Sequence, residues 1–373
     1  MIFTCCVTNT AEAKTRKFIH DARRNNPNAY ICTVGCLSQI KADSEVFEDV
    51  DLIIGSDSKD KVVELIRANT KACLVKEPIN PSFEELFIEK YQNKSRSFLK
   101  IQDGCNQFCS YCIIPYSRGK ERSANHNHVI KQAIQLSKTS NEIVLTGIHT
   151  GRYNDGEYNL YMLLSKLIEI EDLKTIRLSS IEITEISDET LELMKNNNKL
   201  AHHLHIPVQS CSDSVLKAMH RPYTFSEFKS RIKYIRSEIP DISISTDLIV
   251  GFPNETDDEF EIVLNNLNKI KFSFIHLFPY SRKTGTVADK MDGHIDPKIK
   301  KERVRKVFEL QKSITDEFKN SFIGKDVEIL VERVIDERSY GYTKQYIYCV
   351  IDGIYNIGDI VKVNLKKENI YES

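Results

Sequence analysis

The amino-acid sequence predicts an α/β fold whose largest part is a parallel β-sheet. Between residues 98 and 281, apolar segments of strand length alternate with segments whose apolar residues recur at helical spacing. Strands that alternate with helices are typical of a sheet with right-handed crossovers, either an open doubly wound sheet or a partial barrel. In both architectures, functional residues are expected at the C-terminal ends of the strands. The predicted strands are residues 98–104, 142–149, 174–182, 203–210, 241–252 and 272–281.

A smaller α/β segment is predicted before this sheet. Its predicted elements are, in order, helix 11–24, strand 29–34, strand 51–55 and helix 59–68. Residues 76–97 contain two prolines and end in polar residues, which is typical of a linker. We therefore expect an N-terminal domain over residues 1–75 and a linker over residues 76–97.

The C-terminal part predicts a long helix and then a change of period. Residues 297–322 repeat apolar side chains at helical spacing, whereas apolar and polar residues alternate with a period of two in residues 326–334, 344–351 and 358–365. This pattern favours a small β-barrel of about 50 residues. The expected domains are therefore residues 98–322, which include the helix, and residues 323–373.

The composition is that of a soluble globular protein. Of the 373 residues, 41% are hydrophobic and 28% are charged, which excludes a disordered or fibrous chain. The net charge of −1 excludes a uniformly basic nucleic-acid coat protein. No apolar run approaches the roughly 18 residues of a membrane span, and the first residues do not resemble a secretory signal. We expect a cytoplasmic protein with no membrane partner, in which disulfides do not explain the ten cysteines.

Three cysteines form a tight group with the spacing C-x3-C-x2-C: Cys105, Cys109 and Cys112. A structural zinc ion needs four ligands, and the group supplies three, with His126 and His128 as the nearest further candidates. Three thiolates on one loop suit a [4Fe–4S] cluster with one iron left open. The group follows the first predicted strand of the sheet, where this architecture places its chemistry.

The group and its surroundings resemble the radical S-adenosylmethionine (SAM) methylthiotransferase family. The segments that carry this resemblance are residues 99–123, 204–221, 245–256 and 278–286. The resemblance implies an N-terminal methylthiotransferase domain, a radical SAM partial barrel and a C-terminal TRAM barrel. It implies that Cys105, Cys109 and Cys112 hold a catalytic [4Fe–4S] cluster whose open iron binds SAM. It also implies a reducing protein of the flavodoxin or ferredoxin type. The implied SAM-binding residues are Tyr111, Gly147, Glu182 and Gln209.

Within this family, residues 4–17, 142–153 and 177–189 resemble the type that acts on N6-threonylcarbamoyladenosine in tRNA. The type that acts on isopentenyladenosine usually has a Gln-Asn pair at Ile148-His149. The resemblance implies methylthiolation of C2 of adenosine 37 in the anticodon loop, with two SAM molecules and two [4Fe–4S] clusters. Two alternatives stay open at this point: the same reaction on isopentenyladenosine, and a catalytically impaired protein that binds tRNA and SAM. A zinc-containing RNA-binding protein is a more distant third.

The family's second cluster is held by three cysteines of the N-terminal domain, of which Cys5 and Cys36 match two. The first has no match, and we expect the domain to be partial, so that the second cluster is poorly held. Cys6 is expected to point away from Cys5 along an extended strand, and Cys32 to lie on a buried strand.

Several further residues have both a structural and a functional interpretation. Cys211 stands where the family usually has Gly and is expected to be a tolerated small residue. The histidines at 203 and 205 are expected to be packed or hydrogen bonded, and Asp247 to lie near the cofactor or cap a strand. Arg118, Lys120 and Arg122, like the basic run at residues 298–306, can meet tRNA phosphates or be solvated. From Gly324 onward, acidic residues outnumber basic ones by nine to seven, so this segment is not basic.

Overall fold

The computed structural model describes residues 1–75, 82–91 and 94–371. The chain divides into two compact units, each described by itself. The first unit contains residues 1–86, 103–122 and 281–292, and the second contains residues 87–102, 123–280 and 293–373. Parts of the predicted linker, residues 76–81 and 92–93, lie outside the described residues. The units cut across the predicted domain boundaries, so those boundaries stay a proposal about separately folding parts.

The first unit is built on a four-stranded parallel sheet in the order β1-β2-β3-β4. Its elements are β1 (Ile2–Thr4), α1 (Asn9–Asn25), β2 (Cys32–Gly35), α2 (Cys36–Lys41), β3 (Leu52–Ile54), α3 (Val62–Arg67), β4 (Ala72–Leu74) and α4 (Ile114–Arg118), with 3-10 turns at Glu45–Phe47, Lys59–Lys61 and Ala288–Lys290. Val34, Leu52 and Ile54 are completely buried in the centre of this sheet. Helix α1 begins where the Thr8 hydroxyl accepts a hydrogen bond from the N–H of Ala11.

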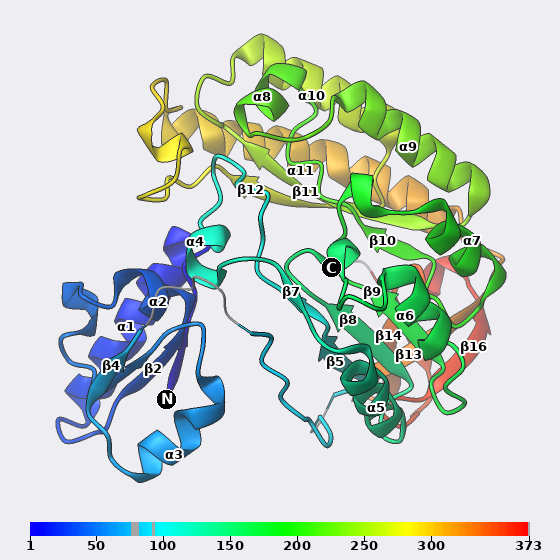
Figure 1. Cartoon of the computed structure of the whole chain (residues 1–373). Coiled ribbons are helices and arrows are strands. Elements are labelled where there is room, and N and C mark those ends of the chain that lie inside the picture. The colour runs from blue at the N-terminus through cyan, green and yellow to red at the C-terminus, as the bar shows by residue number, and fades with distance from the viewer. Residues whose placement is uncertain (76–81, 92–93, 372–373) are drawn as a thin grey trace. The chain divides into compact units, whose positions relative to one another are not determined.

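Six parallel strands form the main sheet of the second unit (Figure 1). They are β5 (Arg96–Lys100), β8 (Glu142–Thr146), β9 (Thr175–Leu178), β10 (His203–His205), β11 (Ser243–Val250) and β12 (Phe274–Pro279). Regular pairing gives the orders β5-β8-β9 and β10-β11-β12. Two parallel bridges, Ile176 to Leu200 and Ser180 to His205, join the halves into one partial barrel. The sequence prediction of six strands is thereby confirmed, and the partial barrel is the alternative that the structure adopts.

Helices connect the parallel strands and cover their outer face (Figure 1). They are α5 (His126–Ser137), α6 (Leu160–Leu167), α7 (Asp188–Asn196), α8 (Asp213–Ala218), α9 (Phe225–Glu238) and α10 (Asp257–Ile270), with 3-10 turns at Thr150–Arg152 and Ile183–Glu185. Helices α9 and α10 each begin with a capping box, at Thr224 and Thr256. The short strands β6 (Gln102–Asp103) and β7 (Arg122–Ser123) lie where the chain passes between the units.

The C-terminal residues form a curled antiparallel sheet after the long helix α11 (Pro297–Asn320). The strands β13 (Asp326–Ile335), β14 (Arg338–Thr343), β15 (Tyr348–Asp352) and β16 (Ile360–Asn364) pair in the order β15-β14-β13-β16, and a 3-10 turn follows at Lys367–Asn369. The inner side of the sheet packs Ile329, Val331, Cys349 and Leu365, which are fully buried. The predicted small β-barrel is confirmed in this form, but the sequence analysis did not identify β14.

A buried ionic cluster attaches this C-terminal sheet to the amino ends of the parallel strands. Arg96 at the start of β5 and Arg177 on β9 both contact Glu142 at the start of β8, with nitrogen–oxygen distances of 3.5 and 3.0 Å. Tyr346, in the turn before β15, stacks on His203 with ring centroids 4.9 Å apart and lies under the Arg177 guanidinium. The pKa of His203 is lowered well below its usual value because the side chain is buried and Arg177 is nearby. The C-terminal sheet therefore covers the amino ends of these strands.

Tyrosine rings are concentrated in the C-terminal sheet. Five of them form successive ring contacts with centroid distances between 4.6 and 6.3 Å. They are Tyr340, Tyr342, Tyr346, Tyr348 and Tyr371.

Among the described residues, no helix combines the length and the apolar composition that a membrane span requires.

Candidate active site

The three grouped cysteines lie on the loop between β6 and α4, entirely within the first unit. Gly104 starts the loop with φ +75°, and a Cβ at this position would lie 2.0 Å from the carbonyl oxygen of Lys120. The N–H of Cys105 donates to the carbonyl of Gly119 over 3.1 Å, and the N–H of Cys112 donates to the carbonyl of Cys109 over 3.0 Å. The first hydrogen bond joins the start of the loop to the residue after α4, and the second forms a turn between the second and third cysteines.

The three cysteines of this loop supply the number and type of donors that a cluster with three cysteine ligands needs. Cys105 and Cys109 are buried and Cys112 is half-buried, and none of the ten cysteines, all of which are described, forms a disulfide. The N–H of Gln107 lies 3.3 Å from the Cys105 sulfur, a contact of the kind that tunes a cluster thiolate. Tyr111, between the second and third cysteines, is half-buried. This donor set matches the three-thiolate requirement of a [4Fe–4S] cluster with an open iron.

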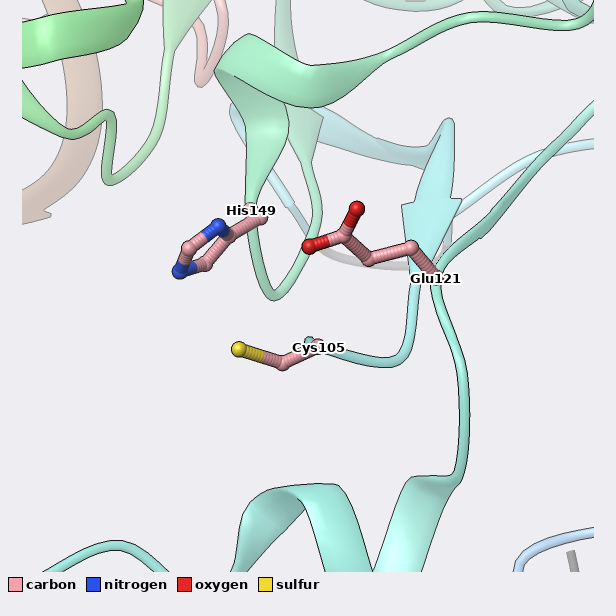
Figure 2. Close-up of side chains that lie close together, drawn as sticks. All are labelled: Cys105, Glu121 and His149. Carbon is pink, nitrogen blue, oxygen red and sulfur yellow. The ribbon is translucent and has the colours of Figure 1, made fainter. Parts of the chain in front are cut away.

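The carboxylate of Glu121, which lies just before β7, holds the backbone of the cysteine loop. Glu121 accepts a hydrogen bond from the N–H of Asn106 over 3.1 Å, and Figure 2 shows its side chain beside that of Cys105. The zinc alternative finds no support at His126, because the Nδ1 atom of this histidine lies 2.7 Å from a carboxylate oxygen of Asp155. The imidazole is thus already engaged at the beginning of α5.

Cys36 contacts Arg118, the last residue of α4. The Nε atom of Arg118 donates to the Cys36 sulfur over 3.0 Å, and Nη1 of Arg118 lies 3.6 Å from the buried carboxylate of Asp103. Arg122 contacts the same carboxylate at 3.0 Å. Arg118 and Arg122 therefore have partners within the protein, which favours a structural role over phosphate binding for these two.

The two adjacent N-terminal cysteines point in opposite directions, and Cys6 is the one that reaches Cys36. Side chains alternate between the two sides of an extended segment. Thr4 directs its hydroxyl inward to the Ser38 hydroxyl, 3.1 Å away, so Cys5 is exposed and Cys6 is buried. A hydrogen bond between the thiols raises the pKa of Cys6 and, together with Arg118, lowers the pKa of Cys36 to about 6. The expectation that Cys6 faces away from Cys5 is met with Cys6 on the inner side. The ligand roles of Cys5 and Cys36 stay predictions.

The predicted SAM-binding residues of the second unit lie at the carboxyl ends of neighbouring strands. Gly147 follows β8, and a Cβ there would lie 3.0 Å from the Cβ of Gln102. Glu182 follows β9 and forms an ion pair with Arg221. Gln209 follows β10 with φ +63°, and its N–H donates to the carbonyl of Asp247 over 2.9 Å. Parallel pairing brings these three positions to one edge of the partial barrel, where this architecture binds ligands.

His149, which the sequence analysis noted only as part of Ile148-His149, is buried near the same edge and is labelled in Figure 2. Its N–H donates to Oε1 of Gln102 over 2.7 Å, and its Nδ1 lies 3.2 Å from Glu185. Burial raises the pKa of Glu185, but hydrogen bonds from His149 and Arg152 outweigh burial, so that this pKa is lowered. The contact between His149 and Glu185 orders the loop that follows β8.

Histidines gather on the inner face of β10, β11 and β12. His205 contacts the Ser245 hydroxyl at 2.9 Å through Nδ1 and the Asp247 carboxylate at 3.3 Å through Nε2. The ring of His276 lies 5.3 Å from that of His205. His203 and His205 are hydrogen bonded, as expected. Sequence reasoning missed His276, although its alternation with Phe274 and Phe278 along one strand was a signal of a shared face.

Three of the basic side chains at the start of α11 form contacts within the protein. Arg303 is buried against Glu255 at 2.7 Å, Arg305 pairs with Glu309 at 2.6 Å, and Lys300 donates to the carbonyl of Tyr280 over 3.1 Å. Phosphate binding by these three cations would compete with those contacts. Cys211 is fully buried, as expected for a tolerated small residue.

Comparison with known proteins identifies the family. The profile of the Radical SAM superfamily matches residues 99–267, and that of the uncharacterized protein family UPF0004 matches residues 1–55. The threonylcarbamoyladenosine tRNA methylthiotransferase MtaB of Bacillus subtilis is 39% identical over 98% of this chain and 85% of its own length. The chain belongs to the radical SAM tRNA methylthiotransferase family. The family is that of an enzyme, and radical SAM enzymes use a [4Fe–4S] cluster and SAM.

Other methylthiotransferases of this family are similar over nearly the same extent. MtaB of Aquifex aeolicus is 36% identical over 97% of this chain and 90% of its own length. The tRNA-2-methylthio-N(6)-dimethylallyladenosine synthase of Thermodesulfovibrio yellowstonii is 34% identical over 98% of this chain and 86% of its own length. The fold is also that of the radical SAM methyltransferase TsrM from Kitasatospora setae, with a TM-score of 0.54, 14% identity, and coverage of 71% of this chain and 59% of that one.

Proposed function

We propose that this enzyme methylthiolates C2 of N6-threonylcarbamoyladenosine 37 in tRNA, using two SAM molecules and two [4Fe–4S] clusters. The observation that carries the proposal is the loop with three cysteines, in a chain 39% identical to a methylthiotransferase named for this nucleoside. Cys105, Cys109 and Cys112 would hold the first cluster. When bound, that cluster and SAM supply the radical that removes a hydrogen atom from C2.

The residues at the carboxyl ends of the strands would bind and orient SAM. Gly147 leaves room beside Gln102, Glu182 is held in place by Arg221, and the positive φ of Gln209 turns the chain at the end of β10. Tyr111, next to the third cysteine, is the other residue that the family resemblance assigns to SAM binding. Their common task is to fix the cofactor and to exclude water from a reactive radical.

The second cluster would be held in the N-terminal sheet by Cys5 and Cys36, and its chemistry would be sulfur donation. The support is the Cys36 thiol, whose pKa is lowered to about 6 by Cys6 and Arg118, since a metal binds the thiolate form. The exposed thiol of Cys5 lies on the neighbouring segment and points away from the buried Cys36, so a shared cluster requires this side chain to turn. The enzyme would work in the cytoplasm on the anticodon loop of tRNA, with its base splayed out. An electron donor of the flavodoxin or ferredoxin type would reduce it.

The same reaction on isopentenyladenosine is the second candidate, because a relative named for the dimethylallyl nucleoside is 34% identical over 98% of this chain. Offering tRNA that carries each nucleoside and identifying the product by mass spectrometry separates the two. A 2-methylthio product from the threonylcarbamoyl nucleoside supports the proposal. A product from the isopentenyl nucleoside alone would identify that nucleoside as the substrate instead. SAM cleavage without a methylthio product would support the alternative of a catalytically impaired protein that binds tRNA and SAM.

Iron and acid-labile sulfide per chain after anaerobic reconstitution test the clusters. We expect about eight irons per chain, falling to about four in the Cys105→Ala/Cys109→Ala/Cys112→Ala variant. Cys349→Ala, at a buried cysteine of the C-terminal sheet, is the control and should keep its iron. About four irons that fall to none would remove the second cluster from the proposal.

A further inference from the structure

The inner face of β10, β11 and β12 combines polar and aromatic side chains within the second unit. Residues paired across parallel strands point to the same side, and the register pairs His205 with Ser245, Ser245 with Phe274, and Asp247 with His276. The opposite side carries fully buried residues such as Ile244 and Leu248, which lie under the helices. We call the first side the lumen face; it consists of His205, Ser245, Asp247, Phe274, His276 and Phe278.

The acidic group of the lumen face, Asp247, contacts a histidine of the same face. The Nε2 atom of His205 lies 3.3 Å from Asp247, and its Nδ1 lies 2.9 Å from the Ser245 hydroxyl. Both nitrogens of His205 are therefore occupied by neighbours on β11. Asp247 and Ser245 are thus engaged with His205, and a further ligand at this face meets the remaining side chains.

His276 is the polar side chain of the lumen face that stays available. It is exposed, and within the described part of the chain its ring nitrogens make no hydrogen bond or ion pair. Partial desolvation by its neighbours and the nearby His205 lower the pKa of His276, so at neutral pH its imidazole offers one donor and one acceptor. A ligand group placed here is therefore recognised by hydrogen bonding.

Two aromatic rings lie on either side of His276 along β12. Phe274 and Phe278 leave 43% and 42% of their surface exposed, and the Phe274 ring lies 4.8 Å from the His276 ring. Exposed aromatic rings on a strand suit the stacking of unpaired nucleobases, which is how proteins bind single-stranded RNA. The lumen face thus offers apolar contact for a base beside a hydrogen-bonding group.

We propose that the lumen face binds the target adenosine and that His276 selects a substituent on N6 that bears a carboxylate. Phe274 and Phe278 contact the base, and the His276 imidazole pairs with the carboxylate of the threonylcarbamoyl group. A hydrocarbon substituent would cover the imidazole without pairing with it, and such a loss discriminates strongly between substrates. The inference rests on the proposed function and adds the residues that choose its substrate.

Binding of anticodon stem-loops to the reconstituted enzyme tests the inference. The three RNAs carry threonylcarbamoyladenosine, isopentenyladenosine or adenosine at position 37. We expect the wild type to prefer the first. His276→Phe should weaken its binding about tenfold or more while changing adenosine binding little, and His276→Gln, which keeps a donor, should lose less. His20→Phe, at an exposed histidine of α1, is the matched control, and iron content checks that each variant is folded.

Methylthiolation kinetics give a second readout, in which His276→Phe should raise KM for the threonylcarbamoyl tRNA more than it lowers kcat. Equal losses on all three RNAs, no loss, or a wild type without preference would overturn the inference. A wild type that methylthiolates the threonylcarbamoyl tRNA while His276→Phe behaves identically refutes the inference and leaves the proposed function standing. A wild type that prefers this stem-loop but forms no methylthio product refutes the proposed function instead.

Discussion

At the carboxyl edge of the partial barrel, the packing of single residues depends on how closely the backbone approaches neighbouring side chains. Gly147 illustrates this, because a Cβ there would lie 3.0 Å from the Cβ of Gln102 and 3.1 Å from its Oε1 atom. That oxygen accepts the N–H of His149. A side chain at position 147 therefore disturbs a neighbour that holds the loop after β8.

We predict that Gly147→Ala weakens SAM binding while leaving the iron content unchanged. The added methyl group displaces Gln102, and the loop after β8 loses the hydrogen bond to His149. Equilibrium binding of SAM to the reconstituted enzyme measures the effect. Lys233→Ala, at an exposed position of α9, is the control. Unchanged SAM affinity in Gly147→Ala would contradict the assignment of this residue to the cofactor site.

At the same scale, the sequence shows the local parts of the site and not its long-range parts. Cys105, Cys109 and Cys112 are recognisable because their spacing along one loop is itself the ligand geometry. Arg118 and Cys36 are 82 residues apart in the sequence, and only the folded chain brings them to 3.0 Å. His276 was missed for a related reason, since its neighbours on the lumen face are set by strand pairing.

Among the elements, helix α11 is attached to the barrel by a buried ion pair. Arg303 donates to Glu255 over 2.7 Å, and both side chains are almost inaccessible, with exposures of 5% and 0%. Burial raises the pKa of Glu255 despite its hydrogen bonds to Gly251 and Arg303. The carboxylate therefore depends on the arginine to remain ionised inside the protein.

We predict that Arg303→Met destabilises the protein by about 3–5 kcal/mol, because it leaves the Glu255 carboxylate buried without its cation. Urea unfolding at neutral pH measures the loss. The double variant Arg303→Met/Glu255→Gln removes the unpaired charge and should recover part of the stability. A double variant no more stable than Arg303→Met would show that packing, not charge, explains the loss.

The start of α5 supplies a pH-dependent contribution. Burial raises the pKa of Asp155, but backbone hydrogen bonds from Tyr158 and His126 outweigh burial and lower it to about 2. Because the folded pKa is below the unfolded one, the stabilisation is complete above about pH 4 and is lost as pH falls through about 2. We predict that Asp155→Asn costs about 2 kcal/mol at pH 7 and less at pH 3.

Urea unfolding at the two pH values measures this dependence. Asp172→Asn, at an exposed aspartate of the loop before β9, is the matched control and should show little effect. An Asp155→Asn penalty of the same size at pH 3 and pH 7 would contradict the role given to the lowered pKa.

Element prediction succeeded where periodicity is strong and failed where pairing decides. The six parallel strands and α11 follow from apolar spacing, whereas β14 has the sequence Arg-Ser-Tyr-Gly-Tyr-Thr, with little alternation of apolar residues. The strand forms because β13 and β15 pair with it on both sides. Gly341 permits this pairing beside the bulge of β13, since a Cβ there would lie 1.9 Å from the carbonyl oxygen of Leu330. No local signal carries that information.

At the scale of the whole molecule, the second unit depends on the attachment of its C-terminal sheet to the amino ends of the strands. Arg96 links the two through Glu332 at 2.6 Å, and Arg177 donates to the carbonyl of Lys344 over 2.9 Å. Tyr346 packs between these arginines and His203. The attachment is thus mostly ionic and aromatic, and it converges on one tyrosine.

We predict that Tyr346→Ala loosens this attachment without unfolding the partial barrel. The substitution removes the ring that packs against His203, Arg96 and Arg177 and leaves the buried cations less well covered. Hydrogen exchange measured by mass spectrometry should become faster in β13–β16 and stay slow in β8–β11. Tyr161→Ala, at an exposed tyrosine of α6, is the control. Unchanged exchange in the C-terminal sheet would show that the ionic contacts alone hold it.

The tyrosine cluster of the C-terminal sheet has a spectroscopic consequence. The chain contains no tryptophan and sixteen tyrosines, so its ultraviolet emission comes from tyrosine, and five of these rings lie in mutual contact in this sheet. Energy passes readily between rings at such distances, which makes the anisotropy of this emission sensitive to whether the sheet is assembled. The protein therefore carries an intrinsic optical reporter for its C-terminal part, and the background is free of indole.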